Sequence, residues 1–232
     1  MPAAAVLFDF GGTLDSNGTS WLERFYPIYL RYGLQATRES FAKVFYLSDD
    51  TLARRHRLDA AALEETLRHQ TRDVLTFIAP ERLDLSERIV SDFLAESRTH
   101  FGRCRPVLDR LHRELPLGIV SNFYGNLAAV LRGEDLEHYF RVVVDSTAVG
   151  CIKPEPAIFR RALEALGTPP ENTWMVGDSL ERDMRGAERV GMPHAWLRGG
   201  ARAAGCCPSG RVLASLDSLP DLLAAASETP AA

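Results

Sequence analysis

Lysine is almost absent from this sequence. Of the 27 basic residues, 25 are arginine, and only Lys43 and Lys153 are lysine. The lysine ammonium is a compact point charge, whereas the arginine guanidinium is a broad planar fork, so a retained lysine can mark a position that an arginine would not fit. These two residues are therefore the first candidates for a specific role.

Cysteine, an excess of one charge and long apolar runs are also scarce. Cys104, Cys151, Cys206 and Cys207 have no metal-ligand spacing and are too few for a disulfide scaffold, so we expect free thiols in a reducing compartment. The net charge of -4 gives no indication of a nucleic-acid or membrane-surface partner. No run approaches the roughly 18 apolar residues of a membrane span, and the start of the chain lacks the basic segment of a signal peptide. We therefore expect a cytoplasmic protein.

Glycine and proline are rare in one long stretch. Residues 16–100 contain four of the 30 glycines and prolines in the chain, which favours helices there. Apolar residues recur at helical spacing in three parts of this stretch, at 22–29, 63–78 and 89–101. Several amphipathic helices in succession predict a small all-helical unit.

The rest of the chain has a different pattern. Short apolar runs end near Gly, Ser or Asp and mostly alternate with helical segments, which is typical of a parallel sheet with crossover helices. These runs are residues 4–8, 117–120, 142–144, 173–176 and 194–197. The predicted fold class is thus α/β: a doubly wound, Rossmann-like parallel-sheet core formed by residues 1–15 and 101–232. The all-helical segment 16–100 would be a cap inserted after the first strand.

Polar residues follow three of the predicted strands. Asp9, Ser121 and Asp178 stand at strand ends, Asp183 lies about one helical turn beyond Asp178, and Lys153 precedes a predicted helix. The carboxyl ends of parallel strands share one edge of the sheet, so we expect these side chains to meet there. Converging carboxylates suit Mg²⁺, and a hydroxyl with an ammonium can hold phosphoryl oxygens while one carboxylate attacks. The pattern predicts phosphoryl transfer.

Four motifs in this order resemble the haloacid dehalogenase superfamily, in the subgroup with a helical cap between the first two motifs. They are Asp9 to Leu14, Leu117 to Asn122, the Lys-Pro-Glu-Pro at 153–156, and Gly177-Asp178 with Asp183. The resemblance implies that Asp9 is a nucleophile forming an aspartyl-phosphate, that Ser121 binds the transferring group and that Lys153 steadies both.

The same resemblance implies a Mg²⁺ site. Its ligands would be Asp9, the backbone carbonyl of Gly11 and Asp178, with Asp183 supporting them. We expect Gly12, Thr13 and Asn122 to contact the substrate, a small phosphorylated metabolite. The sequence carries no signal for the identity of that metabolite or for the oligomeric state.

One position departs from the family pattern. Phosphatases of the superfamily usually carry, where this chain has Gly11, an Asp that serves as general acid and then as base. A positioned acid or base typically contributes about 10² to 10⁴ in rate, and glycine cannot supply it. Asp15 is a possible substitute, although acids in such loops are commonly solvated or form turns.

Three alternatives remain open at this stage. A phosphonoacetaldehyde hydrolase also has a small residue at the Gly11 position, but it needs a cap lysine for a Schiff base, and Lys43 is the only candidate. A 2-haloacid dehalogenase lacks the second acid but does not normally keep the metal carboxylate found here as Asp178. A binding protein without turnover is the third alternative.

Overall fold

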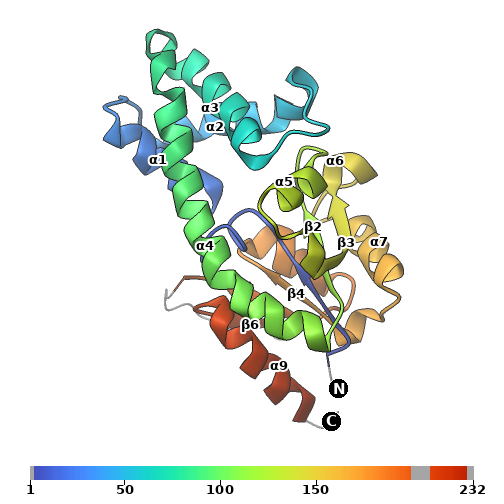
Figure 1. Ribbon diagram of the computed structural model, residues 1–232. Coiled ribbons are helices and arrows are strands. Elements are labelled where there is room, and N and C mark those ends of the chain that lie inside the picture. The colour runs from blue at the N-terminus through green and yellow to red at the C-terminus, as the bar shows by residue number, and fades with distance from the viewer. Residues whose placement is uncertain (1–2, 200–209, 229–232) are drawn as a thin grey trace.

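A parallel sheet forms the centre of the chain in the computed structural model (Figure 1), which describes residues 3–199 and 210–228. Within these residues the sheet has six strands in the order β3-β2-β1-β4-β5-β6, all parallel. The strands are β1 (Ala5–Phe8), β2 (Leu117–Ser121), β3 (Phe140–Asp145), β4 (Thr173–Gly177), β5 (His194–Leu197) and β6 (Gly210–Leu213). The first five lie where the sequence predicts them. The edge strand β6 was not predicted, because only one of its residues, Leu213, is buried.

Strand β1 lies at the point where the strand order reverses. It pairs with β2 on one side and with β4 on the other, so that Leu7 faces Gly118 and Met175 in register. In a doubly wound sheet, ligands bind beyond the carboxyl ends of the strands at such a switch point. The fold therefore places the end of β1, and with it the predicted nucleophile, where a ligand site is expected.

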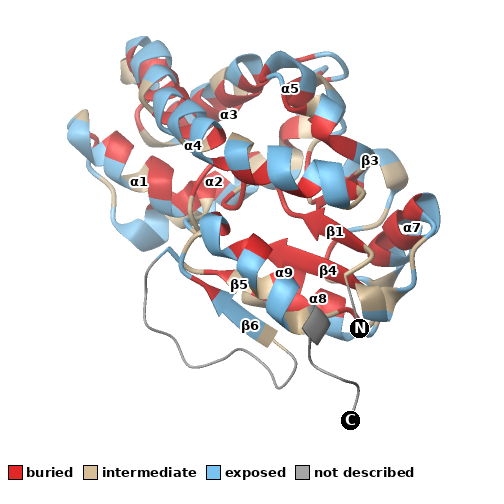
Figure 2. Ribbon diagram, turned by 60° about the horizontal axis from the view of Figure 1, so that its bottom comes forward, coloured by how far each residue is buried: buried red, intermediate tan, exposed pale blue. Residues whose placement is uncertain are grey.

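Helices cover both faces of the sheet. Val6 and Phe8 of β1 point into a cluster that includes side chains of α4 (Ser86–Glu114) and α9 (Leu219–Glu228). Ala5 and Leu7 point the other way, against α7 (Pro156–Leu166) and α8 (Arg185–Glu188). Strands β1 and β4 are buried throughout (Figure 2), as expected for central strands of an α/β sheet.

The cap segment is helical, as predicted. It contains α1 (Trp21–Arg31), α2 (Arg38–Arg55), α3 (Leu63–Ile78), the short helix η1 (Pro80–Leu85) and the first part of α4. Helix α4 has 29 residues and runs without interruption from the cap to the core, alongside α9 (Figure 1). The predicted boundary between cap and core, at residue 100, therefore falls inside one continuous helix.

Short helices make the remaining connections. They are α5 (Leu127–Gly133), η2 (Glu137–Tyr139), α6 (Ser146–Val149), η3 (Pro170–Asn172), η4 (Leu180–Met184) and η5 (Leu216–Ser218). In the described part of the chain, no helix has both the length and the apolar character to cross a membrane. Cys104 and Cys151 are free thiols, and Cys206 and Cys207 lie outside the described residues.

Candidate active site

Three neighbouring strands carry the first candidate residues at their carboxyl ends. Asp9 follows β1, Ser121 is the last residue of β2 and Asp178 follows β4, and β1 lies between the other two strands. The Ser121 hydroxyl donates a hydrogen bond of 2.7 Å to Oδ1 of Asp9. Strand pairing alone thus brings together a buried carboxylate, a hydroxyl and a second carboxylate.

Lys153 reaches the same point from the loop before α7. Its Nζ lies 2.7 Å from Oδ1 of Asp9 and 2.6 Å from Oδ1 of Asp183, and the side chain is buried. Burial on its own would lower the pKa of Lys153, but the negative charges of Asp183 and Asp9 outweigh it, and the pKa is raised. Lys153 is therefore a fixed cation between two carboxylates.

Three acids meet Lys153 at this edge of the sheet. Asp9, Asp178 and Asp183 each offer a carboxylate oxygen within a group that spans no more than 4.8 Å. Burial, followed by the charges of Asp9 and Asp183, raises the pKa of Asp178 well above its usual value. Burial also raises the pKa of Asp183, to about 6, although Lys153 opposes the shift. A compact set of oxygen donors with uncompensated negative charge fits a hard divalent cation such as Mg²⁺.

Two glycines let the backbone approach these carboxylates. Gly12 has a φ of +93°, and a Cβ there would lie 2.4 Å from Oδ2 of Asp178. A Cβ on Gly177 would lie 2.3 Å from Oδ2 of Asp183. Neither distance is compatible with a real side chain, so both acids depend on glycine at these positions.

The residues predicted to contact the substrate mainly form hydrogen bonds within and between the loops of the site. Asn122 accepts a hydrogen bond of 2.7 Å from the Lys153 amide and donates one of 3.1 Å to the Lys153 carbonyl. The Thr13 hydroxyl lies 3.4 Å from Oδ1 of Asp178, and the Gly12 amide donates to Asp15. Asn122 also lines the cavity described below, and so does Gly11, whose carbonyl stays a predicted metal ligand.

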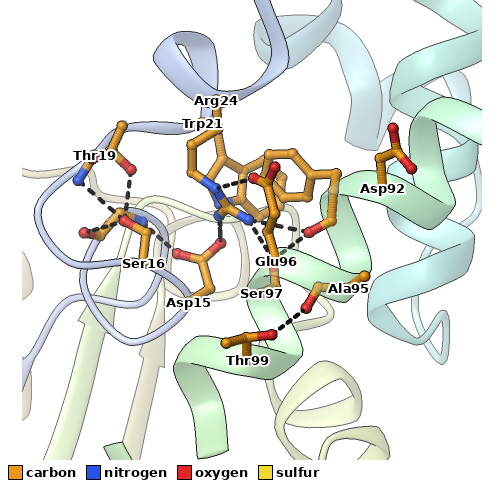
Figure 3. Close-up of polar contacts among 12 residues, drawn as sticks. Asp15, Ser16, Thr19, Trp21, Arg24, Asp92, Ala95, Glu96, Ser97 and Thr99 are labelled. Atoms are coloured by element: carbon orange, nitrogen blue, oxygen red, sulfur yellow. Dashed lines mark hydrogen bonds and ion pairs between the residues drawn. The ribbon is translucent and has the colours of Figure 1, made fainter. Parts of the chain in front are cut away.

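Asp15 belongs to a buried network behind the nucleophile loop (Figure 3). Its Oδ1 accepts a bond of 2.6 Å from the Gly12 amide, and its Oδ2 accepts bonds from Trp21 Nε1 at 2.6 Å and Arg24 Nη1 at 2.7 Å. Arg24 also donates to the Phe93 carbonyl and lies over the Phe93 ring. Both oxygens of Asp15 are occupied and Asp15 does not line the cavity, so its position gives no support to a role as the substitute acid.

The indole of Trp21 fills the space beside Gly11. A Cβ on Gly11 would lie 3.1 Å from Nε1 of Trp21, which Asp15 holds in place. An acidic side chain at position 11 would therefore meet the indole at once. The packing around Gly11 is therefore consistent with the absence of an acidic side chain at this position.

A cavity of about 370 Å³ opens above these residues, between cap and core. Aromatic side chains of the cap, Trp21, Phe45 and Tyr46, form one part of its wall. The other lining residues are Asp9, Gly11, Ser20, Leu22, Asp49, Ser121, Asn122, Phe123, Tyr124, Lys153, Asp178, Ser179, Leu180, Glu181 and Arg182. The size suits a small metabolite.

Two acids in the cavity wall, Asp49 and Glu181, were not predicted from the sequence. Asp49 of α2 lines the wall, and its Oδ1 accepts hydrogen bonds from the Tyr124 hydroxyl and, at 3.3 Å, from Gln70 Nε2. The only signal in the sequence is its position next to the buried stripe of α2, formed by Phe41, Phe45 and Leu52.

Lys43, the second lysine, lies away from the cavity. Its side chain is 74% exposed, and its Nζ pairs with Glu39 one turn earlier on α2 at 2.8 Å. It is not among the residues that line the cavity. The position gives no support to a Schiff base on Lys43.

Comparison with known families agrees with this geometry. The sequence model of the haloacid dehalogenase-like hydrolase family matches residues 3–191, which include every candidate residue described above. The chain belongs to this hydrolase family. The confirmed resemblance covers the first strand, the cap and the core as far as the end of α8.

Curated relatives match this hydrolase over part of their length. Haloacid dehalogenase-like hydrolase domain-containing protein 3 of Mus musculus is 44% identical over 89 residues, 38% of this chain and 35% of the mouse protein. Phosphoserine phosphatase of Thermus thermophilus is 38% identical over 111 residues, 47% of this chain and 39% of that enzyme. The chain thus spans less than half the length of these relatives.

Solved structures of the family share the fold over nearly the whole chain. A haloacid dehalogenase-family phosphatase from Thermococcus onnurineus is 26% identical, with a TM-score of 0.55 over 95% of this chain and 97% of its own. A dehalogenase structure with an intermediate complex has a TM-score of 0.67 at 19% identity, over 96% of this chain and 97% of its own. At that identity the second likeness shows the fold alone.

Proposed function

We propose that this hydrolase is a Mg²⁺-dependent phosphatase of small phosphorylated metabolites that works through an aspartyl-phosphate on Asp9. The observation that carries the proposal is the contact of Asp9 with Ser121 and Lys153 beside Asp178, at the floor of a metabolite-sized cavity. The match to phosphoserine phosphatase of Thermus thermophilus supports the same reaction class.

The chain's own residues supply most of the chemistry. Oδ1 of Asp9 is held by Ser121 and Lys153, and no described residue donates to Oδ2, which leaves that oxygen available. Attack of the carboxylate on phosphorus forms the Asp9–phosphate bond and breaks the bond to the leaving oxygen. Lys153 and Ser121 are placed to stabilise the charge on the phosphoryl oxygens.

Asp9 and Asp178 would hold Mg²⁺, with the Gly11 carbonyl as a further ligand. The bound ion would neutralise charge on the phosphoryl group. Both oxygens of Asp183 already accept hydrogen bonds, one from Lys153 Nζ and one, at 2.9 Å, from the Ser179 amide. We therefore assign Asp183 the task of positioning Lys153 and the loop after β4.

The test is hydrolysis of p-nitrophenyl phosphate and acetyl phosphate with Mg²⁺ and after its removal by a chelator. We expect turnover with the metal only, and a loss of at least about 10³-fold in kcat for Asp9→Asn, because the nucleophile is removed. Asp59→Asn, which changes an exposed acid of the cap, is the matched control and should behave like the parent. Equal activity of parent and Asp9→Asn would contradict the proposal and favour a binding protein.

The same assay separates the other reactions of the family. Release of chloride from 2-chloropropionate without metal, in the absence of phosphatase activity, would favour a dehalogenase. Borohydride trapping with phosphonoacetaldehyde would favour the C–P hydrolase only if an adduct formed on Lys43. The exposed position of Lys43 predicts that no adduct forms.

A further inference from the structure

The leaving oxygen of an alkyl phosphate needs a proton, and the usual donor is missing from this chain. Gly11 has no side chain, and the indole of Trp21 occupies the space beside it. Asp15 is fully engaged with Gly12, Trp21 and Arg24. The proton must therefore come from another group that lines the cavity.

Four acids line the cavity, and three of them have other partners or roles. Asp9 is the proposed nucleophile, and Asp178 lies in the candidate metal site. Glu181 is exposed and forms an ion pair with Arg185 one turn further along, at 2.6 Å. Asp49 is half-buried, belongs to the cap and takes no part in the metal site.

We propose that Asp49 is the general acid and base of this enzyme and that Tyr124 positions it. The proposal rests on the phosphatase activity proposed above. It transfers to the cap the task that other phosphatases of the family perform from the nucleophile loop.

The contacts of Asp49 leave one oxygen free for proton exchange. The Tyr124 hydroxyl and Gln70 Nε2 both donate to Oδ1, and no described residue donates to Oδ2. Tyr124 comes three residues after Ser121, so the residue that orients Asp49 is tied to the strand end that holds the nucleophile. This contact fixes the position of Asp49 in the cap relative to Ser121 and Asp9 in the core.

The surroundings of Asp49 favour its protonated form, which can donate a proton. Burial raises the pKa of Asp49, the Tyr124 hydrogen bond and the Arg182 charge oppose the shift, and the neighbouring Asp50 adds to it. Burial and the Asp49 charge raise the pKa of Tyr124 well above its usual value, so the phenol remains a donor. An acid with a raised pKa is more effective at working pH than an ordinary aspartate.

The proposed step balances over two half-reactions. In the first, Asp9 attacks phosphorus, the bond from phosphorus to the leaving oxygen breaks, and the Asp49 carboxyl gives its proton to that oxygen. In the second, the Asp49 carboxylate takes a proton from a water that attacks phosphorus, and the bond between phosphorus and Asp9 breaks. Asp9 and Asp49 both return to their starting states.

The test compares two leaving groups in Asp49→Asn. The glycerol of glycerol 3-phosphate leaves as an alkoxide that needs a proton, whereas p-nitrophenolate leaves without one. We expect kcat/KM, which reports the steps up to departure of the leaving group, to fall about 10²- to 10⁴-fold for glycerol 3-phosphate. For p-nitrophenyl phosphate it should change less than about 10-fold.

The matched control is Asp59→Asn, which removes an exposed charge of the cap that does not act on Asp49 and should affect both substrates equally and little. Equal losses on both substrates in Asp49→Asn would overturn the proposal, because they would indicate a packing role. No loss on either substrate would overturn it as well. If the parent hydrolyses neither compound, the proposed phosphatase function fails instead.

Tyr124→Phe gives a second measurement that does not require a change at Asp49. The hydrogen bond from Tyr124 lowers the pKa of Asp49, so its loss should move the alkaline limb of kcat/KM for glycerol 3-phosphate to higher pH. A structural role alone would lower activity without moving this limb. An unmoved limb in a folded Tyr124→Phe protein would overturn the assignment of Tyr124.

Discussion

At the scale of single residues, Gly11, Trp21 and Asp15 act as one unit. Asp15 holds the indole nitrogen at 2.6 Å, and the indole in turn lies where a side chain at position 11 would begin. Replacing the glycine with the family's usual acid therefore changes packing as well as chemistry.

We expect Gly11→Asp alone to lower the melting temperature, because its Cβ would lie 3.1 Å from Trp21 Nε1. Overpacking of this kind costs typically about 1–3 kcal/mol. In a Trp21→Phe background, which removes that nitrogen, the same change should be better tolerated, and turnover of glycerol 3-phosphate should change little, because Asp49 already supplies the proton. Calorimetry and steady-state kinetics check the pair, with Trp21→Phe alone as the control. A fully stable single variant would contradict this view of the packing.

At the scale of elements, the site depends on how strands β1, β2 and β4 end side by side. Three carboxylates meet there with one lysine, and burial raises the pKa of Asp178 and Asp183. Protonation of these carboxylates therefore opposes the binding of a divalent cation.

This opposition predicts a pH-dependent response to Mg²⁺. Asp183, with a pKa of about 6, is largely protonated at pH 5 and ionised at pH 7.5, so the site around Asp9 and Asp178 is more negative at the higher pH and the metal should stabilise the protein more there. At about 100 times the dissociation constant, the stabilisation should be about 2.7 kcal/mol. Thermal melts with Mg²⁺ or a chelator measure it, and Asp178→Asn should lose most of the effect. A larger shift at pH 5 would show that these carboxylates do not hold the ion.

The elements also show how far prediction from sequence reaches. The strand ends that carry Asp9, Ser121 and Asp178 were predictable, because each follows a short apolar run with a distinct residue type. The continuity of α4 was not, because Gly102 and Pro106 suggest a break, yet the helix continues through both. Asp49 was also missed, since only the packing of α2 against the loop after β2 brings it to Tyr124.

At the scale of the whole molecule, one apolar cluster joins cap and core. It contains Phe10 of the nucleophile loop, Phe25 and Phe93 of the cap, and Leu108 in the core part of α4. Phe25 and Phe93 stack with ring centroids 4.0 Å apart, and Phe93 also meets Trp21. A continuous core of this kind favours cooperative unfolding.

We therefore expect a single calorimetric transition for the described fold. Phe93→Ala should destabilise the whole chain by about 3–5 kcal/mol, because it leaves a cavity in the shared cluster. Phe77→Ala changes a cap phenylalanine that is 50% exposed and should have little effect. Two separate unfolding transitions in the parent would contradict this expectation. Destabilisation of the cap alone in Phe93→Ala would contradict it as well.

Helix α4 is a long, continuous connection between the cap and the core. At 29 residues it is about 43 Å long, and its two ends are anchored in different parts of the structure. A stiff rod of this length turns a small rotation at the sheet into a larger displacement at its far end. Transplanting this cap onto another core would require cutting a helix rather than a loop.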